Sequence, residues 1–222
     1  MSYRIKLFGF LVIALGALVL FNVGYSALST FSRLNVIEAD RDQWQRPWDV
    51  IQTLNAKPGD LIADIGCGSG YFSLRLSPAV GDKGRIIAED IRKLSLAFLW
   101  FRAKSRHDWN ISLVRGGLTD PHLPRRVNSV LISNTYHEFI DSHAILAHVY
   151  ESLIHNGRVV VLDRAPRPTS NGVSQSTEHE ISSNQVEREL REAHFEIVSR
   201  QDRFIDSDPG HESWWLIVAR KP

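Results

Sequence analysis

Four residues at alternate positions, Asp64-x-Gly66-x-Gly68-x-Gly70, form the stretch of this chain with the clearest capacity for chemistry. An apolar run, Leu61–Ile65, leads into the glycines, and helical spacing resumes over Tyr71–Leu76. We therefore predict a strand, a tight turn and a helix, with the backbone free to approach a ligand at the helix N-terminus. A dinucleotide fingerprint requires a small residue where Tyr71 stands, and a phosphate loop requires a Gly-Lys-Ser/Thr ending that is absent.

This motif resembles motif I of the class I S-adenosylmethionine (SAM)-dependent methyltransferases. SAM is a nucleoside with an amino-acid tail, so its loop needs close backbone contact and an acceptor for an ammonium group. The resemblance implies that the methionine portion of the cofactor is held by Asp64, Gly66, Cys67, Gly68 and Gly70. The alternative is a glycine turn that serves only the connection between strand and helix. Cys67 is the only cysteine, and its place in the loop favours a space-filling role over a nucleophilic one.

A second acidic residue, Asp90, ends the next predicted strand, about 20 residues after the glycines. A nucleoside-binding α/β domain places a carboxylate there to accept both ribose hydroxyls. The resemblance favours Asp90 for this role, whereas strand alternation predicts that Glu89 points the other way. It also implies an adenine contact after the third strand. Asp120 is the candidate, although Asp120-Pro121 is equally typical of a turn.

Polar and ionisable residues follow the fourth predicted strand, residues 128–133. Ligands of open α/β sheets bind outside the carboxyl ends of the strands, where the strand order reverses. We therefore expect Asn134 near the methionine end of SAM, and Tyr136 and His137 facing the methyl acceptor. Tyr136 is also a candidate for a cation–π contact with the sulfonium. His137 is a candidate general base because its ordinary pKa lies near working pH; the alternative is a helix-start residue bonded to backbone.

Composition narrows the possible partners. The formal net charge of +1 gives no basic field for nucleic acid, and the 43% hydrophobic content suffices for a full core. His137, His143 and His148 are not spaced to share one helical face, so no metal site is expected.

A long apolar stretch, Leu7–Leu28, follows Arg4 and Lys6 near the N-terminus. It meets the roughly 20-residue requirement for a helix that spans a bilayer. We predict a single-pass membrane anchor over residues 1–30, with a cleavable signal peptide and an exported protein as the alternative. Arg4 and Lys6 favour a cytoplasmic N-terminus, although Arg33, Arg41 and Arg46 on the other flank nearly balance them. A SAM enzyme needs cytosolic cofactor, which favours instead the remainder of the chain on the cytoplasmic side.

The rest of the chain alternates strands and helices. Residues 31–57 are charged but contain two tryptophans, so we expect them to dock on a methyltransferase domain formed by residues 58–222. That domain is predicted to be α/β: a Rossmann-like, seven-stranded, mostly parallel sheet with an antiparallel last strand and helices on both faces, preceded by the transmembrane helix. Residues 164–181 lack apolar periodicity and are a candidate substrate lid. Ser183 is expected to cap a helix over residues 184–193.

Together these features predict a membrane-attached methyltransferase that transfers a methyl group from SAM to a small or lipid-like acceptor, such as a lipid, a quinone or another apolar molecule. Two other functions fit some of the same residues. One is an NAD-dependent Rossmann-like oxidoreductase, against which Tyr71 argues. The other is a membrane-tethered module that binds SAM without catalysis, which only turnover would distinguish.

Overall fold

In the computed structural model, the chain divides into two compact units, Met1–Trp44 and Gln45–Pro222. The structure describes residues 16, 18, 21–22, 29–30, 32–124, 126–167, 179–206, 208–210 and 212–222. Residues 32–44 of the first unit are helical. Most of the predicted transmembrane stretch lies outside the described residues, as do residues 168–178 of the candidate lid. Among the described residues, no helix combines the length and apolar character that a bilayer crossing needs.

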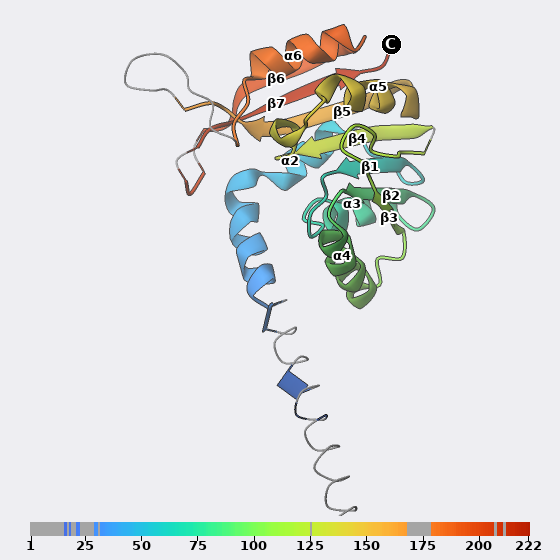
Figure 1. Cartoon of the computed structure of the whole chain (residues 1–222), viewed down its shortest axis with the longest axis vertical. Coiled ribbons are helices and arrows are strands. Elements are labelled where there is room, and N and C mark those ends of the chain that lie inside the picture. The colour runs from blue at the N-terminus through green and yellow to red at the C-terminus, as the bar shows by residue number, and fades with distance from the viewer. Residues whose placement is uncertain are drawn as a thin grey trace, which may run out of the picture. The chain divides into compact units, whose positions relative to one another are not determined.

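The second unit is built on one seven-stranded sheet in the order β3-β2-β1-β4-β5-β7-β6 (Figure 1). The order reverses beside β1, which pairs in parallel with both β2 and β4. Strand β7 runs antiparallel to its two neighbours, β5 and β6. This arrangement confirms the predicted seven-stranded sheet with an antiparallel last strand. The strands are β1 Leu61–Ile65, β2 Arg85–Asp90, β3 Ile111–Arg115, β4 Val127–Ser133, β5 Leu153–Arg164, β6 Glu196–Ile205 and β7 Trp214–Arg220.

Helices cover both faces of the sheet, as predicted. Consecutive residues of β2 enter different clusters: Ile87 joins the core beneath α5 and α6, and Ala88 joins the core beneath α3 and α4. Since neighbouring strand residues point to opposite faces, the two helix pairs lie on opposite sides of the sheet. The helices are α2 Pro47–Thr53, α3 Ser73–Val80, α4 Lys93–Arg106, the 3₁₀ turn η1 Tyr136–Glu138, α5 Ser142–Ser152 and α6 Ser183–Glu192.

The first residues of the second unit contact strands β5 and β6 of the sheet. Arg46 donates a hydrogen bond from Nη1 to the carbonyl oxygen of Phe204 at 2.8 Å, and its guanidinium carbon lies 4.5 Å from the centre of the Phe204 ring. Arg158 of β5 donates to the carbonyl oxygen of Thr53 at 2.9 Å. Residues 46–53 therefore pack with the sheet of the second unit.

Two boundaries differ from the sequence prediction. Ser182, rather than Ser183, caps α6 by accepting the amide of Asn184, while the Ser183 hydroxyl donates to Asp202 at 2.7 Å. Strand β6 extends to Ile205, whereas the apolar residues from which the sequence predicts a strand there end at Val198. It forms an edge of the sheet and is mostly exposed, so it carries no alternation of apolar residues for a sequence pattern to detect.

Candidate active site

The glycine loop joins β1 to α3, and all three of its glycines have positive φ. A side chain at Gly66 would overlap Thr135 at the end of β4, and one at Gly70 would overlap Leu99 of α4. At Gly68 no atom lies within 4 Å of the position that a Cβ would take. Gly66 and Gly70 thus permit close packing of neighbouring elements, while Gly68 leaves open space beside the loop.

Three buried carboxylates surround this loop. The Asp64 carboxylate accepts a hydrogen bond of 2.5 Å from the Ser73 hydroxyl in the first turn of α3. Asp90 accepts the Gly68 amide at 2.9 Å, the Arg92 amide at 2.7 Å and the Arg92 Nε at 3.3 Å. A carboxylate offers about four lone-pair sites, so these bonds leave Asp90 able to accept a further hydroxyl donor. The structure thus brings the predicted ribose ligand to the predicted cofactor loop.

Glu89 was expected to point away from the loop, and the structure corrects this. Its Oε2 accepts the Gly66 amide at 3.3 Å. The physical reason lies at Gly116 after β3, where a Cβ would overlap the Glu89 carboxylate. Alternation fixes the direction of a Cβ, but a long side chain at a strand end bends into the space that a neighbouring glycine leaves.

Burial raises the pKa of Glu89 from its ordinary value of 4.5 to about 7. The Gly66 and Gly116 amides act in the opposite direction, and the nearby charges of Asp90 and Asp64 raise the pKa further. A cationic group bound beside the loop would favour the ionised carboxylate, because an opposite charge stabilises it.

We expect Glu89→Gln to change how stability depends on pH. Between pH 4.5 and about 7 the unfolded chain has lost this proton and the folded chain keeps it, so the free energy of unfolding falls as pH rises. At 1.36 kcal/mol per pKa unit, the loss is roughly 3 kcal/mol, and the variant should lack it. Urea unfolding at pH 5 and pH 8 measures the difference. Glu151→Gln, at an exposed carboxylate of α5, is the control, and parallel curves for all three proteins would contradict the prediction.

Strand β4 ends against the same loop. The Thr135 hydroxyl donates to the carbonyl oxygens of Ser133 at 3.1 Å and Gly66 at 3.4 Å. Asn134 has a φ of 53°, and its amide donates to the carbonyl oxygen of Leu162 at 2.8 Å. Its side-chain Oδ1 is buried and has no hydrogen-bond partner among the described residues. A buried polar atom of this kind calls for a ligand or water, as the position predicted for Asn134 would require.

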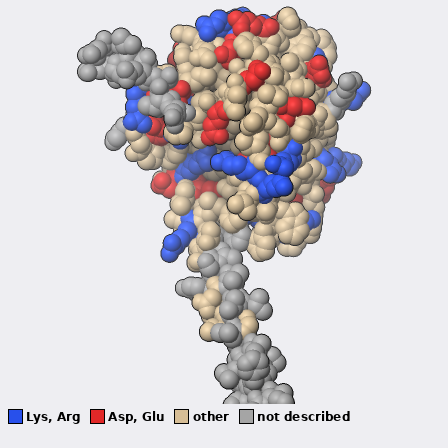
Figure 2. Space-filling view, viewed as in Figure 1, with Lys and Arg blue, Asp and Glu red and all other residues tan. Residues whose placement is uncertain are grey.

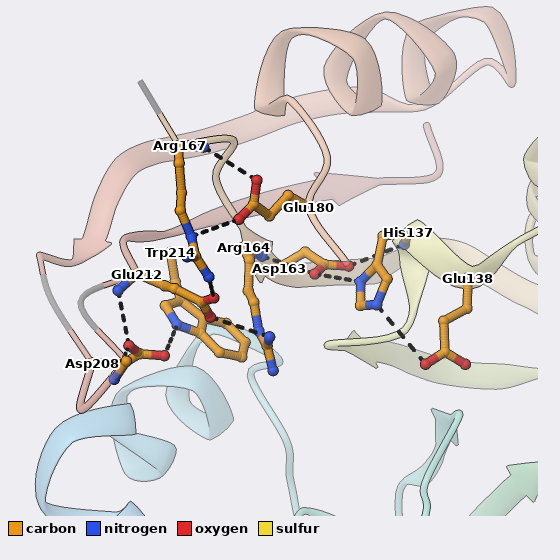
Figure 3. A network of polar contacts seen from close by, with 10 residues as sticks. His137, Glu138, Asp163, Arg164, Arg167, Glu180, Asp208, Glu212 and Trp214 are labelled. Carbon is orange, nitrogen blue, oxygen red and sulfur yellow. Dashed lines mark hydrogen bonds and ion pairs between the residues drawn. The ribbon is translucent and has the colours of Figure 1, made fainter. Parts of the chain in front are cut away.

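His137 forms a buried pair with Asp163 at the end of β5 (Figure 3). Its Nδ1 lies 2.8 Å from Asp163 Oδ1, and its backbone amide donates to Asp163 Oδ2 at 3.2 Å. Its Nε2 lies 3.9 Å from an oxygen of the half-exposed Glu138. Burial lowers the pKa of His137, but the hydrogen bond and charge of Asp163 outweigh it, so the pKa stands above its ordinary 6.5.

Sequence reasoning did not assign a role to Asp163. Its position at the end of β5 could have indicated one. Strands β4 and β5 are parallel neighbours, so their carboxyl ends meet at one edge of the sheet. It also missed His179, whose ring centre lies 5.7 Å from that of His137. Arg164, the next residue after Asp163, carries a buried Nε without a partner among the described residues.

Tyr136 does not face an acceptor site, and this prediction was wrong. The side chain is 1% exposed, lies in the core beneath α5 and α6, and donates its hydroxyl to Glu189 of α6 at 2.6 Å. Burial and this bond raise the pKa of the Tyr136 hydroxyl. Burial raises the pKa of Glu189, but hydrogen bonds from Tyr136, Gln185 and Ser142 outweigh it and hold that pKa below its usual value.

Tyr136→Phe is therefore expected to lower stability and to spare the site. Removing one partner of a buried hydrogen bond costs about 1–3 kcal/mol. We expect a loss of that size in chemical unfolding, together with unchanged SAM binding in calorimetry. Unaltered stability with weakened SAM binding would instead return Tyr136 to the site.

Cys67 and Asp120 occupy different settings. Cys67 is buried against Leu74 and Leu99, and burial raises the pKa of its thiol, which fits the space-filling interpretation. Asp120 closes a turn by accepting the His122 amide at 2.7 Å, and its carboxylate lies 3.8 Å from Nδ1 of His148 on α5. The adenine contact of Asp120 stays a prediction.

The strand order, with its reversal beside a glycine loop and its antiparallel last strand, defines a Rossmann-like methyltransferase fold. Residues 62–157 match the family model described as a methyltransferase domain. Together with the loop and the buried Asp90, this match supports a class I SAM-dependent methyltransferase.

Three relatives illustrate the likeness. The chain is 28% identical over 136 residues to a demethylmenaquinone methyltransferase of Oceanobacillus iheyensis, covering 60% of this chain and 55% of that protein. It is 28% identical over 142 residues to a 2-phytyl-1,4-naphtoquinone methyltransferase of Nostoc sp., covering 60% and 62%. It thus spans less than two thirds of these curated relatives. A solved SAM-dependent methyltransferase from Aquifex aeolicus has the same fold, with a TM-score of 0.69, 18% identity, and 79% and 89% coverage.

The residues present fit SAM. Open space at Gly68 admits the cofactor to the loop backbone, the buried Asp90 can accept a further hydroxyl, and Asn134 Oδ1 has no partner within the part of the chain that the structure describes. Three carboxylates beside the loop suit a ligand that carries an ammonium and a sulfonium.

Proposed function

We propose that this chain transfers the methyl group of SAM to a hydroxylated, apolar ring of the quinol type. The observation that carries the proposal is the buried His137–Asp163 pair at the carboxyl ends of β4 and β5. His137 lies in the turn η1 that follows β4, two residues after Thr135, which contacts the glycine loop. Relatives named for demethylmenaquinone and phytyl-naphtoquinone support a ring acceptor of this kind.

SAM, when bound, supplies an electrophilic methyl group on a sulfonium. The protein must then present an electron-rich acceptor in line with that carbon, and positioning of bound partners is worth about 7–11 kcal/mol of such a barrier. A ring hydroxyl becomes electron-rich when it loses its proton, and His137 is placed to take this proton at Nε2. Asp163 holds the Nδ1–H of the same ring, which leaves Nε2 as the basic nitrogen and stabilises the imidazolium that forms.

Arg164 supports the same chemistry from the neighbouring position. Its Nη1 lies 3.1 Å from Glu212, its guanidinium carbon lies 5.2 Å from the centre of the Trp214 ring, and its Nε has no partner among the described residues. Figure 3 shows its side chain beside Trp214 and next to the His137–Asp163 pair. A guanidinium there favours the oxyanion that deprotonation produces.

We propose further that residues 1–30 anchor the enzyme as a single transmembrane segment, with residues 31–57 as a docking segment and residues 58–222 on the cytoplasmic side. The apolar stretch Leu7–Leu28 supports the anchor. Carbonate extraction of membranes and protease protection of a C-terminal tag test it. Recovery of the intact chain in the soluble fraction would reject the anchor, and a shortened chain would indicate the cleaved signal.

Two measurements test the function. Calorimetry should detect binding of SAM and of its demethylated product to the folded full chain; no binding would reject the cofactor assignment. Membrane lipid extract incubated with methyl-labelled SAM should then yield a labelled quinone-type product in mass analysis. A labelled product of another chemical class would show that the acceptor is not a quinol. SAM binding without any turnover would favour a SAM-binding module that does not catalyse.

A further inference from the structure

One buried acid of the cofactor site has no cationic partner. Glu89 is 3% exposed, and within the part of the chain that the structure describes no Lys, Arg or His side chain forms an ion pair with it. It accepts the Gly66 amide at 3.3 Å, and the Gly116 amide contributes a second hydrogen bond. Ionising a buried carboxyl without a nearby cation is costly, so a charge placed beside it decides whether it keeps its proton.

The Gly66 peptide connects Glu89 with the exit of β4. Its amide donates to Glu89 Oε2, and its carbonyl oxygen accepts the Thr135 hydroxyl at 3.4 Å. Asn134, whose buried Oδ1 has no partner among the described residues, directly precedes Thr135. Since we expect the methionine end of SAM at Asn134, a single peptide of the loop separates that position from the Glu89 carboxylate.

The other acids around Glu89 oppose a further negative charge. Burial raises the pKa of Glu89 to about 7, and the charges of Asp90 and Asp64 raise it further. Burial, followed by the charge of Asp64, also raises the pKa of the Cys67 thiol, so the sulfur is neutral near pH 7. The cluster therefore favours a protonated Glu89 until a cation binds beside the loop.

The neighbouring cations are engaged elsewhere. Arg92 lies 3.3 Å from an oxygen of Asp90, the buried Arg102 of α4 donates to the carbonyl oxygen of Ser69 at 2.6 Å, and Arg115 at the end of β3 is exposed. Both signs of charge occur on the face shown in Figure 2, and the chain as a whole carries +1. Attraction for a cationic cofactor must therefore come from the carboxylates inside the site.

We propose that Glu89 makes the site select SAM over its demethylated product, by losing a proton to solvent when SAM binds and regaining one when only the product is bound. SAM carries one positive charge more than the product, the sulfonium. Breaking the O–H bond of Glu89 hands the proton to a buffer base, and the carboxylate that remains balances the sulfonium. After methyl transfer that charge is gone, so Glu89 takes a proton from solvent and the product is held less tightly.

The proposal concerns the cofactor and not the acceptor. Binding of SAM without proton release would overturn it and leave the proposed function standing. Failure to find a labelled quinol would reject the proposed acceptor and leave the role of Glu89 standing.

Calorimetry of the full chain with SAM and with its demethylated product, at pH 6.5 in two buffers of different ionisation enthalpy, counts the protons. The amino groups of both ligands keep their protons at this pH. We expect release of about half a proton or more per SAM and at least about threefold less per product. From pH 5.5 to pH 7.5 the SAM affinity should rise about tenfold, and the product affinity should rise less.

Glu89→Gln keeps an oxygen for the loop amides and cannot ionise. It should abolish the proton release and lower the preference for SAM over product about tenfold at pH 7.5. Glu151→Gln, at an exposed carboxylate of α5, is the matched control and should behave as the unmodified chain does. The comparison of the two ligands on the unmodified chain needs no variant, so the test holds even where Glu89→Gln does not fold.

Two results would overturn the proposal. Equal proton release with both ligands would show that the site does not sense the sulfonium charge. Release that persists in Glu89→Gln but is lost in His137→Gln would place the proton on His137 instead.

Discussion

His137→Gln is expected to lower the rate of methyl transfer by about 10²- to 10⁴-fold, the usual contribution of a positioned general base. Glutamine keeps a polar side chain of similar reach but cannot accept a proton. SAM binding should be unchanged, since His137 contacts Asp163 and not the glycine loop. The rate is measured with labelled SAM and the acceptor recovered from membrane extract. The control is His143→Gln, at an exposed histidine of α5.

The pH profile separates a base from a structural residue. A general base must be neutral, so the rate should rise with pH through the pKa of His137, which Asp163 holds above 6.5. Asp163→Asn removes that charge and should move the rising limb to lower pH while lowering the plateau. A purely structural role for Asp163 would reduce the rate without moving the limb. Full activity of His137→Gln would remove His137 from the mechanism.

Asp90→Ala is expected to weaken SAM binding by about 10- to 10²-fold. Beyond the amides of Gly68 and Arg92 and the Arg92 Nε, the carboxylate has capacity for a ribose hydroxyl, and a hydrogen bond to a charged group contributes about 1.5–3 kcal/mol. Calorimetry with SAM and with its demethylated product measures the loss, which should be similar for both because they share the ribose. Chemical unfolding shows how much of the effect comes from the freed Gly68 amide.

The matched control is Asp82→Ala, an exposed acid in the turn before β2, at the opposite end of that strand. It should leave both affinity and stability within experimental error. Unchanged affinity in Asp90→Ala would reassign the ribose contact, and Glu89 of β2, which accepts the Gly66 amide of the loop, would become the first candidate.

The sequence by itself determined the frame of the site. Local spacing located the glycine loop, the acidic end of β2 and the exit of β4, because strand ends and tight turns depend on residues that are near one another in the chain. The parallel order then follows from alternating strands and helices, and it brings those ends to one edge. Asp90 and the loop glycines could be found in this way, since short-range geometry alone requires them.

The tertiary structure decided which side each neighbouring residue faces. Tyr136 and His137 are adjacent in a 3₁₀ turn, yet Tyr136 enters the core to meet Glu189, 53 residues away, and His137 meets Asp163, 26 residues away. Glu89 likewise turned toward the loop because Gly116 on the next strand left room. No periodicity within the chain encodes such choices, because they depend on the volume and hydrogen bonds that distant segments provide once they are packed.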